Sequence, residues 1–402
     1  MDIGAEKIEE SVKDYFLKLN LKASIDYDSF CKELVEHNPT LANEFLTIIK
    51  HREGNKEGEV YTVKNQNLDF SLTVAKMLAD FYMKYCNWFF NFKELSPRKL
   101  LDIGCDNGII TCFYGVLFPH CQVIGVDKSE SGIKCAEELA KKLNLKNVIF
   151  MLMDFNDLNS HFENGSFDIV TSVRVLHEIM GTISVPKYWS LEGYLSTNLD
   201  KGDHNYLKVI EKLLATNGSY VFAERLENPA AVGQWANLLR KANLHMDWEQ
   251  SSFIEFHENG QHLKSPTLLA GKKNENIDTV EGIRKLYLKN TSMELKYGEE
   301  LKSVSAEIVF NNKQGKKLIN GTLLNFHNHE WYKMRFEIWT NEECLLVYGY
   351  GNMGYRNLMV FPLSSRVEAE NRLRDIIKQF RDNGEVFQYT TVVDRDIKED
   401  FL

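Results

Sequence analysis

The sequence predicts an α/β protein: a doubly wound, seven-stranded, mostly parallel sheet, with a helical cap before it and a small α+β domain after it. Three observations predict this class. Helical periodicity fills residues 1–97, short apolar runs alternate with helix-length segments over residues 98–273, and strand patterns separated by turns dominate residues 274–402. Strands that alternate with helices of this length specify a parallel sheet covered on both faces.

The predicted cap contains three helical stretches, "SVKDYFLKLNL", "DSFCKELVEHNPTLANEFLTIIKH" and "LTVAKMLADFYMKYCNWFFNF", with a polar break at "REGNKEG". The last stretch carries an aromatic cluster from Phe81 to Phe92. Such a cluster forms either an acceptor pocket or part of the core, and its helical spacing favours the core.

The central region contains five runs that predict parallel strands: "KLLDIG", "CQVIGVD", "VIFMLMD", "FDIVTSV" and "GSYVFAE". Helical segments separate them, among them "SGIKCAEELAKKLN", "YLKVIEKLLATN" and "AVGQWANLLRKANL". Two further strand-like segments, "HMDWEQSSFIEFHE" and "SPTLLAGKK", follow without an intervening helix. They predict an antiparallel edge on the sheet.

The polar run "KKNENIDTVEG" marks a domain boundary. Beyond it we expect a helix over Val280–Lys289 and then strands in "SVSAEIVFNN", "KLINGTLLNF", "WYKMRFEIW", "CLLVYGYG" and "NLMVFPL". The helical segment "RVEAENRLRDIIKQFRDNG" follows them. This pattern predicts a small domain built on an antiparallel sheet.

Composition narrows the classes of function. The net charge of −9 argues against a protein that mainly binds nucleic acid or a membrane surface, because phosphate attraction needs a basic footprint. The N-terminal segment shows no secretory signal and no spanning helix, so we expect a cytoplasmic protein. The seven cysteines form no CxxC pair, which predicts buried free thiols rather than a metal site or disulfides.

The stretch "LDIGCDNG" predicts a ligand-binding loop after the first strand. Gly104 allows a tight turn, and Gly108 allows the following helix to approach closely. A dinucleotide fingerprint has glycine where Asp106 stands, and a carboxylate there is a poor neighbour for phosphate. Asp127 ends the second strand, where an acidic residue accepts hydrogen bonds from ribose hydroxyls. The loop therefore predicts a nucleoside ligand without a pyrophosphate.

Four stretches in order, "LDIGCDNG", "VIGVDKS", "MLMDFND" and "FDIVTSVRVLHEI", resemble the motif set of class I S-adenosylmethionine-dependent methyltransferases over Lys99–Lys273. The resemblance implies a Rossmann-like sheet, S-adenosylmethionine as cofactor and a cap over the cofactor mouth. It assigns cofactor binding to Asp102, Gly104, Cys105, Asp106, Gly108, Asp127, Lys128, Asp154, Phe155, Ser172, Val173 and Arg174.

Within this set, Asp102 and Gly104 would shape the methionine pocket, Asp127 would hold the ribose, and Asp154 with Phe155 would flank the adenine. Asp106 would lie near the amino-acid end of the cofactor. Taken singly, Asp102 and Asp154 have another interpretation, since either could simply cap a turn or a helix. No metal ligand is assigned.

The acceptor side is expected after the fourth strand, where His177 is the candidate general base and Glu178 either orients it or stays solvated. The alternative is that this turn only packs under the cofactor. The long segment Met180–Asn205, with Tyr188, Trp189 and Tyr194, is interpreted as a substrate lid or as a helix packed on the cap.

Two further features bear on the acceptor. The strand ends in "SVRVL" rather than in the Asn/Asp-Pro-Pro-aromatic turn, which disfavours methylation of nucleobases or of glutamine. Glu224 and Arg225, after the fifth strand, either touch the acceptor or form structural pairs.

The C-terminal stretch "YKMRFEIWTNEECLLVYGYGNMGYRNLMVF" with the helix after it resembles the WGR domain, a module linked to nucleic-acid ends. Its Trp-Gly-Arg-Val-Gly positions would fall on Tyr350, Gly351, Asn352, Met353 and Gly354. The resemblance implies that Lys333, Arg335 and Arg356 contact phosphates. A protein-interaction or dimerisation module is the alternative.

The sequence thus predicts a methyltransferase that acts on a small-molecule or peptide acceptor. Two alternatives remain: an RNA methyltransferase guided by the C-terminal domain, and a non-catalytic protein that binds the cofactor.

Overall fold

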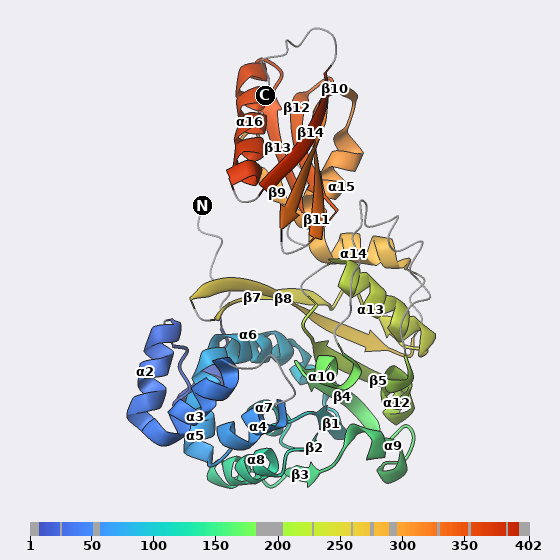
Figure 1. Cartoon of the computed structure of the whole chain (residues 1–402). Helices are drawn as coiled ribbons and strands as arrows, with labels where there is room; N and C mark the ends of the chain where they lie inside the picture. The colour runs from blue at the N-terminus through green and yellow to red at the C-terminus, as the bar shows by residue number, and fades with distance from the viewer. Residues whose placement is uncertain are drawn as a thin grey trace. The chain divides into compact units, whose positions relative to one another are not determined.

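The computed structural model describes residues 8–24, 26–50, 57–181, 204–226, 229–258, 260–273, 277–288, 296–327, 330–352, 355–382 and 385–393 (Figure 1). The chain divides into two compact units. The first holds residues 1–182, 202–227 and 238–276, and the second holds residues 183–201, 228–237 and 277–402.

The N-terminal cap of the first unit is helical, as predicted. Its elements are α1 (Glu10–Lys18), α2 (Tyr27–His37), α3 (Pro39–Lys50), α4 (Glu57–Lys64), α5 (Leu68–Ala75), η1 (Lys76–Leu78), α6 (Ala79–Phe89) and η2 (Phe90–Leu95). The aromatic side chains of α6 and η2 are mostly buried in the same core as the sheet, which confirms the core interpretation. The sequence pattern did not predict α4.

The cap has two apolar cores. Side chains of α1 and α6 belong to the large cluster that also contains residues of the sheet. Side chains of α2, α3 and α4 form a separate, smaller cluster that includes Phe30, Phe45, Val60 and Val63. Helix α5 contributes to both clusters, with Leu72 in the first and Phe70 in the second.

The central sheet confirms the predicted fold class (Figure 1). Seven strands lie in the order β3-β2-β1-β4-β5-β8-β6, and an eighth strand, β7, pairs with β8. The strands are β1 (Lys99–Ile103), β2 (Gln122–Asp127), β3 (Val148–Leu152), β4 (Phe167–Val173), β5 (Leu214–Ala223), β6 (His245–Met246), β7 (Ser252–Glu258) and β8 (Gln261–Gly271). Strands β1 to β5 pair in parallel, whereas β8 is antiparallel to β5, β6 and β7, which is the predicted antiparallel edge.

Helices between these strands cover the sheet. They are α7 (Ile109–Leu117), α8 (Glu130–Lys142), η3 (Phe155–Asp157), α9 (Leu158–His161), α10 (Leu176–Met180) and α12 (Asn205–Leu213). Helix α13 (Pro229–Lys241) follows β5 in the sequence, and its residues up to Asn237 belong to the second unit. Because side chains alternate along a strand, Leu100, Val123 and Ile169 point into the core that contains α6, α7 and α8. The sheet thus presents the carboxyl ends of its parallel strands at one edge.

The turn after β1 depends on two glycines with a left-handed backbone. Gly104 has φ +72°, and a Cβ there would lie 2.3 Å from Val175 Cγ2. Gly108 has φ +78°, and a Cβ there would lie 2.8 Å from Ala136 Cβ of α8. Both predicted roles of these glycines, in turning the chain and in close helix approach, agree with this geometry.

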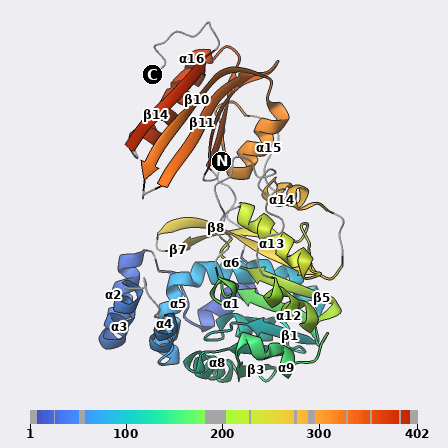
Figure 2. The same cartoon turned by 45° about the vertical axis from the view of Figure 1, so that its right-hand side comes forward.

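The second unit contains a six-stranded antiparallel sheet in the order β14-β10-β11-β12-β13-β9. Its elements are α14 (Thr279–Leu288), β9 (Glu300–Lys302), α15 (Ser303–Lys313), β10 (Lys316–His327), β11 (Glu330–Thr340), β12 (Cys344–Gly351), β13 (Arg356–Pro362), α16 (Arg366–Asp382) and β14 (Glu385–Val393). Strands β14, β10 and β11 lie side by side in Figure 2. Helices α16 and α15 pack on opposite faces of this sheet, with Val347 facing α16 and Leu346 facing α15.

Two predictions for this unit are wrong. The segment "SVSAEIVFNN" is the helix α15 rather than a strand, because Ala306, Val309 and Phe310 lie at helical spacing and pack together on the sheet. Arg356 is 4% exposed, and its guanidinium donates to Glu307 Oε2 at 3.0 Å and to the carbonyl of Gly351 at 2.8 Å, so it is not available to a phosphate.

The other predictions for this unit stay open. Lys333 and Arg335 are exposed, so their contacts with phosphates remain a prediction. Met353 and Gly354 lie outside the described residues, so the resemblance to a WGR domain is not tested at those positions.

The described residues contain neither a helix suited to a membrane nor a cluster of metal ligands. None of the described helices combines the length and the apolar character that crossing a membrane would require. Within the same ranges, no group of three or more His, Cys, Asp or Glu side chains is placed to hold a metal ion. All seven cysteines are free, and six of them are buried.

We expect Gly104→Ala to destabilise the first unit strongly, because alanine would add left-handed strain and a clash with Val175. Gly165→Ala is the matched control, since Gly165 has the same φ of +72° and its would-be Cβ meets only the Leu214 carbonyl, at 3.9 Å. Strain should lower the free energy of unfolding of the control by only about 1–2 kcal/mol. Gly104→Ala should lower it by at least about 2 kcal/mol more, because of the clash. Urea titration measures both losses, and equal losses would contradict the role of Val175.

Candidate cofactor and acceptor site

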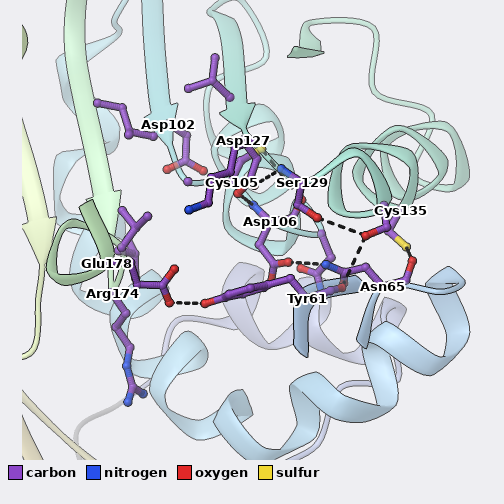
Figure 3. Close-up of a pocket in the computed structure, with 18 of the residues that line it drawn as sticks. Tyr61, Asn65, Asp102, Cys105, Asp106, Asp127, Ser129, Cys135, Arg174 and Glu178 are labelled. Carbon is purple, nitrogen blue, oxygen red and sulfur yellow. Dashed lines mark hydrogen bonds between the residues drawn. The ribbon is translucent and has the colours of Figure 1, made fainter. Parts of the chain in front are cut away.

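A cavity of about 990 Å³ lies at the carboxyl ends of β1, β2 and β4 (Figure 3). Most residues predicted from the motifs line it: Asp102, Gly104, Cys105, Asp106, Asp127, Lys128, Asp154, Phe155, Val173, Arg174, His177 and Glu178. Two predicted residues do not. Gly108 packs against α8, and Ser172 hydrogen-bonds to Glu224 and Tyr220 inside the fold.

The Asp127 carboxylate is held in place by backbone amides. Its Oδ2 accepts from the Asp106 N–H at 2.9 Å, and its Oδ1 accepts from the Ser129 N–H at 2.8 Å. The same loop is tied to β2 by the amides of Gly104 and Cys105, which donate to the Val126 carbonyl. Burial and the neighbouring Asp106 raise the pKa of Asp127, while the two amides oppose that rise.

Asp106 links the loop to the cap. Its φ of +46° lies in the left-handed region, which aspartate tolerates better than most residues, so it can occupy a position where a dinucleotide fingerprint has glycine. Its carboxylate forms an ion pair with Lys64 and accepts from Asn65 Nδ2 at 2.7 Å. Asp106 was predicted to lie beside the amino-acid end of the cofactor. In the structure it also holds Lys64 of α4 and the following residue, Asn65.

Lys64 is a largely buried cation at the cavity wall. Burial alone lowers the pKa of Lys64, but attraction to Asp106, Tyr82 and Asp127 outweighs it, so the pKa lies above its usual value. The ammonium group therefore stays charged and offsets part of the acidic charge of the loop.

Asp102 lies beneath the loop and is almost fully buried. Its two oxygens accept from Thr111 Oγ1 at 2.5 Å and from Thr171 Oγ1 at 2.7 Å. Burial raises the pKa of Asp102 to about 6, although both hydroxyls stabilise the charged form. Asp102 thus links the end of β1 to α7 and to β4, and it also lines the cavity.

Asp154 and Phe155 lie at the start of η3. The Asp154 carboxylate accepts from the Asn156 N–H at 2.9 Å, which is the helix-capping role that the sequence left open. Phe155 packs near Tyr206 of α12, with ring centroids 5.6 Å apart. Both residues line the cavity as predicted, so capping does not exclude a ligand role.

Helix α4 is the part of the site that the sequence reasoning missed. Tyr61 donates to Glu178 Oε1 on one side of the cavity, while Lys64 and Asn65 contact Asp106 on the other (Figure 3). One signal was present in the sequence. Lys64 has Tyr61 and Val60, and no carboxylate, three and four positions before it, so no carboxylate at those positions competes with a partner from elsewhere in the fold.

Glu178 therefore does not orient His177. It is the Tyr61 partner, whereas His177 Nδ1 lies 3.6 Å from Glu224 Oε2. Glu224 is fully buried and accepts from Ser172 and Leu176, which is the structural pairing that the sequence left open. Arg225 lines the cavity.

Arg174 lies near Glu178, on the same side of the cavity (Figure 3). Its backbone has φ +56°, and its guanidinium donates to Glu258 Oε2 at 3.0 Å while it lies over the Phe81 ring. Tyr82 of α6 also lines the cavity, and burial raises the pKa of its hydroxyl. The predicted lid residues Tyr188, Trp189 and Tyr194 lie outside the described residues.

Comparison with known proteins agrees with this geometry. A family model described as a methyltransferase domain matches residues 96–276. Residues 96–276 form a class I S-adenosylmethionine-dependent methyltransferase domain. The region that matches the family contains the whole parallel sheet and every motif residue of the cavity. The predicted methyltransferase class and its cofactor, S-adenosylmethionine, are thus confirmed.

Proteins that resemble this domain are named as different kinds of methyltransferase. A release factor glutamine methyltransferase of Buchnera aphidicola is 39% identical over 16% of this chain and 24% of its own length. A ribosomal RNA small subunit methyltransferase G of Aster yellows witches'-broom phytoplasma is 26% identical over 44% of this chain and 85% of its own. The chain spans 36%, 19% and 24% of the first curated relatives that it matches.

Among solved structures, a SAM-dependent methyltransferase from Aquifex aeolicus is 14% identical, covers 46% of this chain and 91% of its own, and has a TM-score of 0.33.

We expect Lys64→Met to loosen α4, because it leaves the Asp106 carboxylate without its cation. Opening of α4 should become easier by about 2 kcal/mol. Asp106→Asn alone should have a similar effect, but the double variant should lose less than the sum, by about 1–3 kcal/mol of coupling. Hydrogen exchange of the α4 amides measures each opening free energy. Strictly additive losses would show that the ion pair does not hold α4.

We expect Asp102→Asn to change how stability depends on pH. The pKa of Asp102 in the fold is about 6, above the unfolded value of 3.8, so its contribution is fully present below about pH 4 and is lost as pH rises through 6. The stability of Asp102→Asn relative to the natural chain should therefore rise between pH 4.5 and 7.5 by about 2 kcal/mol. Urea titrations across this range test it, and a pH-independent difference would contradict it.

Proposed function

We propose that this chain is a methyltransferase that transfers the methyl group of S-adenosylmethionine to a small-molecule or peptide acceptor. The observation that carries the proposal is the amide-held Asp127 carboxylate at the wall of a cavity of about 990 Å³, inside the methyltransferase domain. Two fixed amides orient the carboxylate, which leaves its remaining lone pairs for ligand hydroxyls.

The charges of the cavity fit this cofactor. The carboxylates of Asp102, Asp106 and Asp127 surround the loop, and they disfavour a pyrophosphate while they favour a cationic or amino-bearing ligand. Lys64 supplies the cation that suits a carboxylate at the amino-acid end. Asp127 would hold the ribose, and Asp154 with Phe155 would flank the base.

When bound, the cofactor supplies an electrophilic methyl group on a sulfonium sulfur. The chain then has to align the acceptor and accept its proton. His177 lines the cavity and is the residue to which we assign proton acceptance. Tyr61 and Tyr82 of the cap limit the access of water and present aromatic surface to the acceptor.

The position of α4 supports a small acceptor. Its side chains contact Glu178 on one side of the cavity and Asp106 on the other, so α4 spans the cavity at this point. A folded macromolecule would have to displace those contacts, whereas a small molecule or an extended peptide tip would not.

We expect Asp127→Asn to weaken the binding of S-adenosylhomocysteine, the demethylated cofactor, by about 10- to 150-fold, because one charged acceptor is lost. Isothermal titration calorimetry measures this loss. Asp14→Asn, on the exposed face of α1, is the matched control and should bind as the natural chain does. With methyl-labelled cofactor and a fractionated extract, the natural chain should label a small-molecule or peptide fraction and Asp127→Asn should label far less.

Each alternative gives a different result. Label in RNA would support nucleic-acid methylation guided by the C-terminal region. Tight cofactor binding with no labelled fraction would support a non-catalytic binding protein. Binding of NAD in place of S-adenosylhomocysteine would overturn the proposal itself.

A further inference from the structure

A buried carboxylate lies directly after β5, next to the acceptor side of the cavity. Glu224 is 2% exposed. Burying a carboxylate costs several kcal/mol unless hydrogen bonds compensate it. Glu224 has such bonds, because Oε1 accepts from Ser172 Oγ at 3.0 Å and Oε2 accepts from the Leu176 N–H at 3.1 Å. Ser172 is in turn bonded to Tyr220, with the two oxygens 2.7 Å apart.

These bonds aim the carboxylate at the first turn of α10. The Leu176 N–H and the His177 side chain lie on adjacent residues, and both face Glu224 Oε2. The His177 Nδ1 atom is buried and has no hydrogen-bond partner, and Glu224 Oε2 is 3.6 Å away. Catalytic hydrogen bonds are often this long before substrate binds and shorten afterwards.

The His177 ring also reaches the cavity, since the residue is among those that line it. An imidazole with its Nδ1 proton directed to a carboxylate has its Nε2 lone pair free to accept a proton. Because the carboxylate is negatively charged, it also stabilises the imidazolium that forms. This combination is what a general base requires.

We propose that Glu224 is a positioning residue that holds His177 as the Nδ1–H tautomer and stabilises its protonated form. The catalytic part rests on the proposed methyl transfer. In that reaction the acceptor O–H or N–H bond breaks and the new Nε2–H bond forms on His177. The acceptor lone pair takes the methyl group, and the C–S bonding pair stays on sulfur as the neutral thioether. His177 later releases the proton to solvent.

Other ionisable groups do not take this role. Glu178 neighbours His177 in sequence, but its carboxylate accepts from Tyr61. The remaining titratable or charged groups lining this end of the cavity are Tyr61 of α4, Tyr82 of α6, Arg174 after β4, Tyr206 of α12 and Arg225 after Glu224. None of these supplies a buried carboxylate against His177 Nδ1.

Two variants separate the hydrogen bond from the charge. Glu224→Met has nearly the same size and lacks both acceptor oxygens, so His177 should move from the Nδ1–H to the Nε2–H tautomer. Glu224→Gln keeps an acceptor oxygen and loses the charge, so the tautomer should stay and the imidazolium should be less stable. Long-range ¹H–¹⁵N spectra of the ligand-free chain report the tautomer, with His177→Gln identifying the signals and Glu178→Gln as the control that leaves the tautomer unchanged.

Methyl transfer to the acceptor found by labelling provides the second readout. Glu224→Gln should lower kcat by about 10- to 100-fold with KM changed less than about threefold. In a His177→Gln background the Glu224→Gln change should have no further effect on kcat. If Glu224→Met does not fold, Glu224→Gln still tests the charge.

These measurements distinguish failure of the role proposed for Glu224 from failure of the proposed methyl transfer. An unchanged His177 tautomer in folded Glu224→Met overturns the positioning role, whether or not the chain transfers methyl groups. A changed tautomer with an unchanged kcat overturns the catalytic part. A changed tautomer in a chain that labels no acceptor leaves Glu224 as the residue that holds His177 and removes the proposed methyl transfer instead.

Discussion

The loop after β1 is held to the end of β2 by backbone amides, and the geometry of the cavity depends on this contact. Gly104 and Cys105 donate to the Val126 carbonyl, and Asp106 donates to the Asp127 carboxylate. Because β1 and β2 are parallel neighbours, their carboxyl ends meet at one edge. The amides therefore set the loop and the acidic residue relative to each other before any ligand arrives, which lowers the ordering cost of binding.

Asp106 extends this constraint to the cap. Its amide belongs to the contact with β2, while its carboxylate holds Lys64 and Asn65. One residue thus couples the floor of the cavity to its cover. A glycine at this position would satisfy the backbone equally well, but it would leave Lys64 buried without a compensating charge.

The sheet and its motifs were predictable from the sequence because their signals are local and strong. Each parallel strand is a short apolar run bounded by a turn, and Asp102 and Asp127 stand at strand ends that parallel pairing brings together. The errors have physical causes. The apolar residues of α15 fit the spacing of a strand as well as that of a helix, and the packing of Arg356 against Glu307 involves residues far apart in sequence.

The acceptor side of the cavity was less predictable, because its contacts also join residues that are far apart in the sequence. His177 was identified by its chemistry, but its partner is Glu224, 47 positions away, rather than the adjacent Glu178. Successive residues of a helix point in different directions, so adjacency in sequence does not predict a contact between their side chains. Pairing of β4 with β5 is what brings the two segments together, and periodicity alone does not reveal it.

The cap is held to the domain by two kinds of interaction, and their strengths differ. Helices α1 and α6 share an apolar core with the sheet, so separating them would expose a large buried surface. Helix α4 packs within the smaller cluster of α2, α3 and α5, and the hydrogen bonds and ion pair that it makes to Glu178 and Asp106 are polar. Polar contacts of this kind contribute about 1–3 kcal/mol each. Breaking them therefore costs far less than unfolding the unit, so the free energy that keeps α4 over the cavity is small enough for ligand entry and exit.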